Sequence, residues 1–199
     1  VKQRGAIIVT NLYSNNIDIL MPSINTNFST TRRLRNLKPQ PLPSFFGADP
    51  NVLFLPPHPK RRDEGGLRKK GHYKEGASAD RALPLITVIT VVFNGAVTLE
   101  KSICSVIEQN FDNVEYLIID GGSTDGSVEL LKKYDSAIDY WVSEPDAGIY
   151  DAFNKAVMCS TGDWICFMGA DDYFFSKMVL SQMSRCFLRD DDGVKLVYG

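Results

Sequence analysis

The second half of the chain alternates short apolar runs with segments of helical periodicity. The runs are rich in β-branched residues, as expected for strands buried on both faces of a sheet. They lie at Leu85–Phe93, Val114–Asp120, Ile138–Glu144 and Asp163–Gly169, with a last one at Val194–Tyr198. Helical spacing follows Thr98, which we expect to cap the first helix, and recurs at Ser127–Tyr134, Ile149–Val157 and Lys177–Leu188. The alternation predicts an α/β fold over residues 84–199, with a mostly parallel sheet flanked by helices.

The first 83 residues differ in composition. They contain eight of the ten prolines, and up to Arg81 they carry fourteen Lys and Arg against six Asp and Glu. Proline disrupts helices and central strands, so we predict an extended, irregular, basic arm or linker over residues 1–83, with room for one strand at Ala6–Thr10. Such an arm can associate peripherally with the acidic inner face of a membrane, although a solvated linker is the favoured alternative.

Composition and charge exclude several classes of function. The net charge is only −2, which gives no reason to expect a nucleic-acid partner. No apolar run approaches the roughly 20 residues that a membrane-spanning helix needs, so we expect a cytoplasmic protein. The cysteines lack metal-binding spacing and are interpreted as reduced core thiols; they are Cys104, Cys159, Cys166 and Cys186.

Acidic residues follow the predicted strands. Asp120 ends the second strand, Asp146 follows the third, and Asp171 and Asp172 follow the fourth. The carboxyl ends of parallel strands meet at one edge of a sheet, where ligands bind in open α/β folds. Carboxylates gathered there repel one another unless a cation or a ligand compensates them, which favours a functional site.

The glycine-rich loop after the second strand, GGSTDG at Gly121–Gly126, lacks the lysine and the spacing of phosphate-binding motifs. A diphosphate that approaches this acidic edge therefore needs a bridging metal ion. Mg²⁺ and Mn²⁺ are typically held by one or two carboxylates together with phosphate oxygens and water. The pair Asp171 and Asp172, which follows a buried strand, offers two carboxylates for such a metal ion.

Four motifs resemble a known family. TVVFN (Thr90–Asn94), DGGSTDGS (Asp120–Ser127), SEPDAGIYDAFNKA (Ser143–Ala156) and GDWICFMGADD (Gly162–Asp172) are similar, in order and spacing, to the nucleotide-binding domain of GT-A type, inverting family two glycosyltransferases. The similarity covers residues 84–199 and is greatest to bacterial enzymes that assemble surface polysaccharides. It implies a GT-A-like domain, incomplete at its C-terminus, that takes a sugar from a nucleotide sugar, with UDP as the expected nucleotide.

The resemblance also implies roles for single residues. Asp120 would accept the imide N–H of the base, Phe93 and Asn94 would border the base, Asp171 would bind the ribose and sugar, and Asp172 the metal. Asp146, together with Gly148, Asp151, Asn154 and Lys155, resembles a segment that lines the donor pocket. For Asp151, Asn154 and Lys155, a solvated helix face is an equal alternative. Asp125 would either steady the base-binding loop or cap the following helix.

The reaction implied by the resemblance is a metal-assisted inverting displacement by an acceptor hydroxyl, carried by a glycan or a lipid-linked acceptor. Relatives place the catalytic base well beyond the aspartate pair, so we identify no catalytic residue and expect the base beyond Gly199. Two alternatives remain open: a sugar nucleotidyltransferase, and a non-catalytic nucleotide-sugar-binding or assembly module. Tyr150, Phe153 and Trp164 are interpreted as core residues, and Asp190, Asp191 and Asp192 as a solvated charge run.

Overall fold

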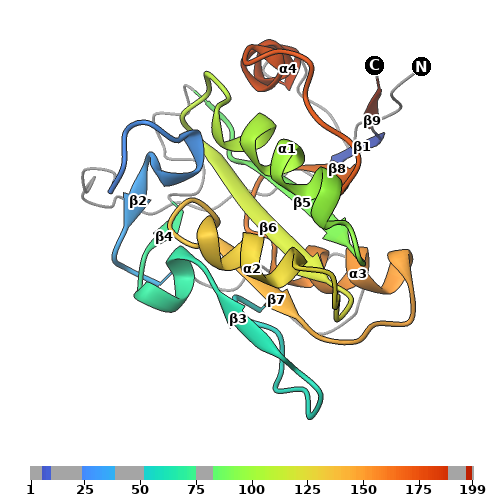
Figure 1. The fold of residues 1–199 in the computed structure, drawn as a ribbon. Coiled ribbons are helices and arrows are strands. Elements are labelled where there is room, and N and C mark those ends of the chain that lie inside the picture. Colours follow the sequence, from blue (N-terminus) through green and yellow to red (C-terminus); the bar gives the residue numbers. More distant parts are fainter. Residues whose placement is uncertain (1–5, 10–23, 39–51, 75–82, 188–195, 199) are drawn as a thin grey trace.

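A computed structural model describes residues 6–9, 24–38, 52–74, 83–187 and 196–198, and it confirms the predicted α/β fold (Figure 1). Its centre is a seven-stranded sheet. In spatial order the strands are β3 (Asp63–Gly65), β7 (Tyr140–Ser143), β6 (Val114–Asp120), β5 (Ile86–Val92), β8 (Trp164–Gly169), β1 (Ala6–Val9) and β9 (Leu196–Tyr198). A separate two-stranded sheet pairs β2 (Leu34–Arg35) with β4 (Tyr73–Lys74).

The four central strands, β7, β6, β5 and β8, are parallel. Every residue of β5 and β6 is buried, as the mostly apolar, β-branched runs predict, and this includes the charged Glu115 and Asp120 of β6. The register places Asp120 beside Val92 and Gly169 beside Val91. The carboxyl ends of β6, β5 and β8 therefore lie next to one another, which is the edge at which the sequence predicts a site.

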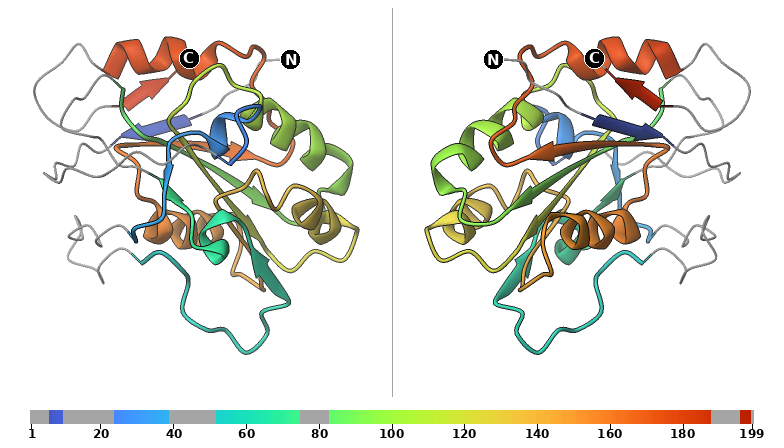
Figure 2. Two further views of the ribbon diagram at one scale, coloured as in Figure 1. Left: turned by 90° about the vertical axis from the view of Figure 1, so that its left-hand side faces the viewer. Right: turned by 90° about the vertical axis from the view of Figure 1, so that its right-hand side faces the viewer.

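Helices cover both faces of this sheet (Figure 2). α1 (Ala96–Ile107), α2 (Ser127–Lys133) and α4 (Val179–Phe187) contribute to one core cluster, in which Leu99, Leu131 and Leu180 are buried. α3 (Ile149–Cys159) packs on the opposite face through Ala152 and Ala156. Each predicted helix exists, with ends within a few residues of the expected ones.

Two details of these helices correct the sequence-based expectations. Gly95, and not Thr98, is the N-terminal cap of α1, because the backbone N–H groups of Thr98 and Leu99 already donate to the Gly95 carbonyl. Ile149 and Tyr150 are 55% and 81% exposed at the start of α3, where the helix extends past the sheet edge. Trp164 is a core residue as predicted.

The sequence predicts an extended, irregular arm or linker over residues 1–83, and the described parts of this segment pack on the sheet. β3 extends the sheet beyond β7, β1 pairs with β8 and β9, and the short helix η1 (Ser29–Thr31) is fully buried. The Ser29 hydroxyl donates to the carbonyl oxygen of Val106 at 3.1 Å, which ties η1 to α1. β1 lies within the strand predicted at Ala6–Thr10, whereas the contacts of β3 and η1 depend on polar side chains and backbone groups that hydrophobic periodicity does not indicate.

Buried charges hold this segment at the amino-terminal ends of the strands. The guanidinium of Arg68, on the short helix η2 (Leu67–Lys70), is paired with Glu115 on β6, and both side chains are at most 2% exposed. Arg68 Nη1 also donates to the carbonyl oxygens of Leu53 and Cys159. Burial alone would raise the pKa of Glu115, but Arg68 and hydrogen bonds from Thr161 and Thr87 lower it below its ordinary value.

A second buried pair predicts a pH dependence of stability. Asp139 lies 3.5 Å from the Lys74 ammonium. Burial raises the pKa of Asp139 to about 7, because the lowering of this pKa by Lys74 is smaller than the effect of burial. Because this folded-state pKa lies above the ordinary value, the folded protein binds a proton that the unfolded chain has lost, and stability falls as the pH rises. We expect the free energy of unfolding to fall by about 1 kcal/mol from about pH 6 to 8 in the wild type but not in Asp139→Asn. Urea unfolding would measure this; equal pH profiles would contradict it.

The cysteines with described side chains are free thiols. Cys159 and Cys166 are buried, which raises the pKa of each thiol to about 12, and Cys104 is partly exposed. The Cys186 side chain and Asp190–Asp192 lie outside the described part of the chain. Within the described ranges, no helix combines the length and the apolar character that crossing a membrane requires.

Candidate functional site

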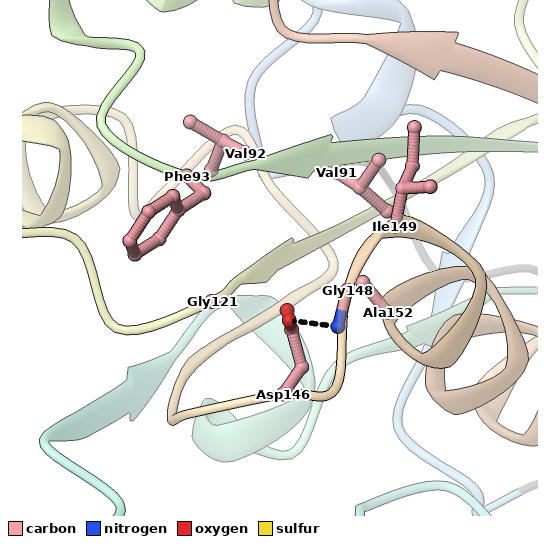
Figure 3. Close-up of a pocket in the computed structure, with 8 residues that line it drawn as sticks. All are labelled: Val91, Val92, Phe93, Gly121, Asp146, Gly148, Ile149 and Ala152. Carbon is pink, nitrogen blue, oxygen red and sulfur yellow. Dashed lines mark hydrogen bonds between the residues drawn. The ribbon is translucent and has the colours of Figure 1, made fainter.

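A cavity of about 430 Å³ opens at the carboxyl ends of β5 and β6, beside the start of α3 (Figure 3). Its walls come from three chain segments: the end of β5, Gly121 after β6, and the turn into α3. The lining residues are Val91, Val92, Phe93, Gly121, Asp146, Gly148, Ile149 and Ala152. Phe93 is 68% exposed, so an aromatic face is available at the rim for a planar ligand group.

Asp120 ends β6 and immediately precedes the cavity-lining Gly121. The Asp120 side chain is fully buried, and Oδ2 accepts three hydrogen bonds: from the Gly122 N–H at 3.1 Å, the Ser123 N–H at 3.0 Å and the Ser143 hydroxyl at 2.6 Å. The other oxygen, Oδ1, is buried and has no hydrogen-bond partner. A buried carboxylate oxygen without a donor is costly, so this atom is suited to a ligand that supplies an N–H.

The Gly121–Gly126 loop is tied to the turn after β5 by Asn94 and to the start of α1 by Asp125. The Thr124 N–H donates to Asn94 Oδ1 at 2.9 Å, and the Asn94 N–H donates to the Ser123 hydroxyl at 2.7 Å. Asn94 adopts the left-handed conformation (φ 51°), which asparagine tolerates better than most residues. Asp125 accepts from the Ala96 N–H and from Ser127, so it joins the starts of α1 and α2.

Asp125 links the end of this loop to the start of α1 and accepts from Ser127 in the first turn of α2, but the N-terminal cap of α2 is Gly126. Desolvation alone would raise the pKa of Asp125, but the hydrogen bonds from Ala96 and Ser127 hold the pKa below its ordinary value.

Asp146 lies in the turn between β7 and α3, where its Oδ1 accepts the Gly148 N–H at 2.8 Å (Figure 3). A Cβ on Gly121 would lie only 2.7 Å from Asp146 Oδ2, so a larger residue there would displace the Asp146 carboxylate. Glu144 fixes the same turn through ion pairs with Arg61 at 2.8 Å and Lys155 at 3.1 Å. Lys155 therefore holds the cavity wall and is not a freely solvated helix residue.

Asp171 and Asp172 form the turn after β8. Asp172 Oδ2 accepts the Gly169 N–H at 3.0 Å, and a Cβ built on Gly169 would lie 2.7 Å from Asp171 Oδ1 and 3.3 Å from Asp172 Oδ2. Both carboxylates thus converge above one glycine at the sheet edge. Asp171 is exposed and Asp172 partly so, which leaves them accessible to a ligand.

The structure places the predicted site residues along one edge, but not all in one cavity. Phe93 and Asp146 line the cavity; Asn94, Asp120 and Asp125 support its wall and the adjacent loop. The aspartate pair lies on the far side of β5 from Asp120, about 10 Å away by two strand spacings. In the described residues, no three His, Cys, Asp or Glu side chains cluster closely enough to hold a metal by themselves.

Sequence reasoning missed three residues that act on Asp120. Ser123 and Ser143 lie within the quoted motifs, and their polar groups donate to its carboxylate. Arg62 donates from Nη1 to the Ser123 carbonyl oxygen at 2.7 Å. Ser143 could have been found as a hydroxyl residue at a strand end, whereas Ser123 donates through its backbone N–H and Arg62 lies in a basic, proline-rich stretch, so neither offers such a signal.

Comparisons with known proteins agree with the motifs. The model of "Glycosyl transferase family 2" matches residues 87–196. An uncharacterised glycosyltransferase of Mycobacterium tuberculosis is 37% identical over 100 residues, which cover 50% of this chain and 38% of that protein. A "PGL/p-HBAD biosynthesis glycosyltransferase" of Mycobacterium bovis is 30% identical over 121 residues, or 59% of this chain and 47% of that protein. The matched part thus spans less than half the length of these relatives.

Among solved structures, a mannosyltransferase from Pyrobaculum calidifontis in complex with GDP-Man and Mn²⁺ is 26% identical, with a TM-score of 0.48. The match covers 54% of this chain and 33% of that one. TarS 1-349 of S. aureus, in complex with UDP-GlcNAc, is 22% identical with a TM-score of 0.47, and the match covers 51% and 30% of the two chains.

Proposed function

The chain belongs to glycosyl transferase family 2, and on that premise we propose that its cavity edge binds a nucleoside-diphosphate sugar, with uridine as the preferred nucleoside. The observation that carries the proposal is the buried, unpartnered Oδ1 of Asp120 at the end of β6. A carboxylate oxygen can only accept a hydrogen bond. It therefore suits the ring N–H of uracil or guanine and disfavours the ring lone pair that cytosine and adenine present.

The rest of the donor fits along the same edge. The exposed ring of Phe93 borders the base, and Asp146 and the start of α3 form the wall that follows. The diphosphate then extends across the end of β5 toward the turn at Asp171 and Asp172. The distance of about 10 Å between the two ends of the site, set by two strand spacings, suits a nucleoside diphosphate.

The aspartate pair fits a divalent ion of the Mg²⁺ or Mn²⁺ type. The pair offers two convergent carboxylates without a third protein ligand among the described residues, which matches ions that keep waters and bind substrate phosphates. Asp172 would hold the ion, and Asp171 would contact the ribose and the sugar. When bound, such an ion stabilises the negative charge that develops on the departing nucleoside diphosphate.

The reaction proposed for the whole enzyme is inverting transfer of the sugar to a hydroxyl of a glycan or lipid-linked acceptor, with a role in polysaccharide biosynthesis. The described residues supply donor binding, and we assign none of them as the general base. A nucleotidyltransferase is disfavoured because the segment Phe93–Thr98, which comprises the turn after β5 and the start of α1, contains no Lys or Arg to bind a triphosphate.

The metal assignment predicts that Asp172→Asn will lose the effect of Mn²⁺ on nucleotide binding. The amide oxygen of asparagine can still accept the Gly169 N–H, so the turn is kept while the charge is lost. In the wild type, we expect Mn²⁺ at about 1 mM to increase the affinity for UDP at least tenfold, since a tenfold gain needs only about 1.4 kcal/mol. In the variant, titration calorimetry should give equal affinities with Mn²⁺ and with EDTA.

Glu129→Gln is the matched control, because it removes one exposed negative charge on α2. It should leave the Mn²⁺ effect unchanged. If Mn²⁺ tightens UDP binding to Asp172→Asn as much as to the wild type, Asp172 does not hold the metal ion. The assignment of Asp120 would not be affected by that result.

A further inference from the structure

The carboxylate of Asp120 is held by two separate chain segments. The loop after β6 supplies the N–H groups of Gly122 and Ser123, and β7 supplies the hydroxyl of Ser143. All three donors converge on Oδ2, and this leaves Oδ1 without a partner. The orientation of the carboxylate therefore depends on how the loop and the strand lie relative to each other.

Arg62 joins these same two segments from a third part of the chain. Its backbone N–H donates to the Ser143 carbonyl oxygen at 2.8 Å, and its Nη1 donates to the Ser123 carbonyl oxygen at 2.7 Å. The residue immediately precedes β3, whose pairing with β7 starts at Asp63 and Ser143. The backbone of Arg62 is thus fixed on β7 while its side chain reaches the loop.

The neighbouring Arg61 has a different role. Its guanidinium contacts Glu144 at 2.8 Å, Glu64 at 2.8 Å and the Pro56 carbonyl oxygen at 2.7 Å. These contacts anchor the segment itself and the turn that leads to Asp146. Among the described residues, the Arg62 side chain has one hydrogen bond, and it is to the loop that carries the donors of Asp120.

We propose that Arg62 is a positioning residue for base recognition: it holds the Ser123 loop against β7 so that three donors fix Oδ2 of Asp120 and Oδ1 is left free for the base. This inference rests on the proposed function of Asp120. It assigns a role in donor selectivity to the segment before residue 84, which lies outside the part of the chain matched by the family model.

A general electrostatic effect is the competing explanation, because any positive charge near the site attracts a diphosphate. The two explanations differ in their dependence on the base. Attraction of the phosphates affects UDP and CDP equally, whereas a displaced Asp120 affects only the nucleotide whose ring N–H it accepts. Lys60→Ala is the matched control, since it removes the same charge from the same exposed segment two residues away.

The experiment compares wild type, Arg62→Ala and Lys60→Ala in the full chain, with UDP and CDP titrated in the presence of Mn²⁺. We expect Arg62→Ala to weaken UDP binding about tenfold and to leave CDP binding unchanged, while Lys60→Ala preserves the wild-type ratio of the two affinities. Equal losses for UDP and CDP in Arg62→Ala, or the same loss of selectivity in Lys60→Ala, would overturn the proposal.

Hydrogen exchange without nucleotide separates this inference from the proposed function. Arg62→Ala should raise the exchange rates of the Gly122 and Ser123 amides about tenfold and leave those in the middle of β6 unchanged. Unchanged rates at the two amides would overturn the positioning role even if UDP binds. A wild-type protein that binds neither nucleotide would contradict the proposed function, and the exchange comparison would still decide whether Arg62 holds the loop.

Discussion

Replacing Asp120 by Asn is expected to convert a site that prefers UDP into one that prefers CDP. The three donors at Oδ2 require an acceptor, so the amide oxygen of asparagine will take that position. The amide NH₂ then occupies the place of the unpartnered Oδ1. It faces the ring N–H of uracil with a donor, but it can donate to the ring nitrogen of cytosine. UDP affinity should fall about 100-fold, which corresponds to about 2.7 kcal/mol, while CDP gains relative to UDP.

Glu129→Gln is the control for this exchange. It makes the same carboxylate-to-amide change in an exposed side chain on α2, nine residues away. This variant should keep the preference for UDP. Calorimetric titrations of both variants with UDP and CDP would measure the change, and a retained UDP preference in Asp120→Asn would show that Oδ1 does not read the base.

The second large effect is on stability. Arg68→Ala should lower the free energy of unfolding by about 3–5 kcal/mol, because it leaves the fully buried carboxylate of Glu115 without its counter-ion. It also removes the donors to the Leu53 and Cys159 carbonyl oxygens. A loss of this size is a large fraction of the stability of a typical domain. Guanidinium unfolding, followed by circular dichroism, would measure it.

Two further variants test the cause. Glu115→Gln in the Arg68→Ala background should recover part of the loss, since the neutral amide can still accept from Thr87 and Thr161 and no charge remains buried. Lys70→Ala removes an exposed ion pair with Asp135 from the same short helix, and it should cost less than about 1 kcal/mol. Similar losses in Arg68→Ala and Lys70→Ala would show that the buried pair does not anchor the segment.

The central sheet could be predicted because its strands are fully buried. Residues Ile86–Val92 and Val114–Asp120 are mostly apolar runs rich in β-branched residues, and turn residues mark where each ends. Of the outer strands, β1 and β9 lie within the predicted runs Ala6–Thr10 and Val194–Tyr198, whereas β3 could not be predicted in the same way. β3 has the sequence Asp-Glu-Gly, and its place in the sheet depends on backbone pairing with β7 and on ion pairs of neighbouring residues.

The candidate site could likewise be predicted only in part. The acidic residues at strand ends could be identified from the order of the elements, because a parallel sheet brings its carboxyl ends together. Their immediate partners could not. Arg62 lies 61 residues from Ser123 in the sequence, and a contact over that distance follows from tertiary packing alone. The exposure of Ile149 and Tyr150 likewise depends on where α3 begins relative to the sheet edge.

The account as a whole depends on the buried carboxylate of Asp120 reading the ring N–H of a nucleotide base. The most direct test is to titrate the wild-type protein calorimetrically with UDP, GDP, CDP and ADP in the presence of Mn²⁺. We predict that UDP binds most tightly. CDP and ADP, which lack the ring N–H, should bind at least about tenfold more weakly than UDP. Equal affinities for all four nucleotides, or tighter binding of CDP or ADP, would contradict the account.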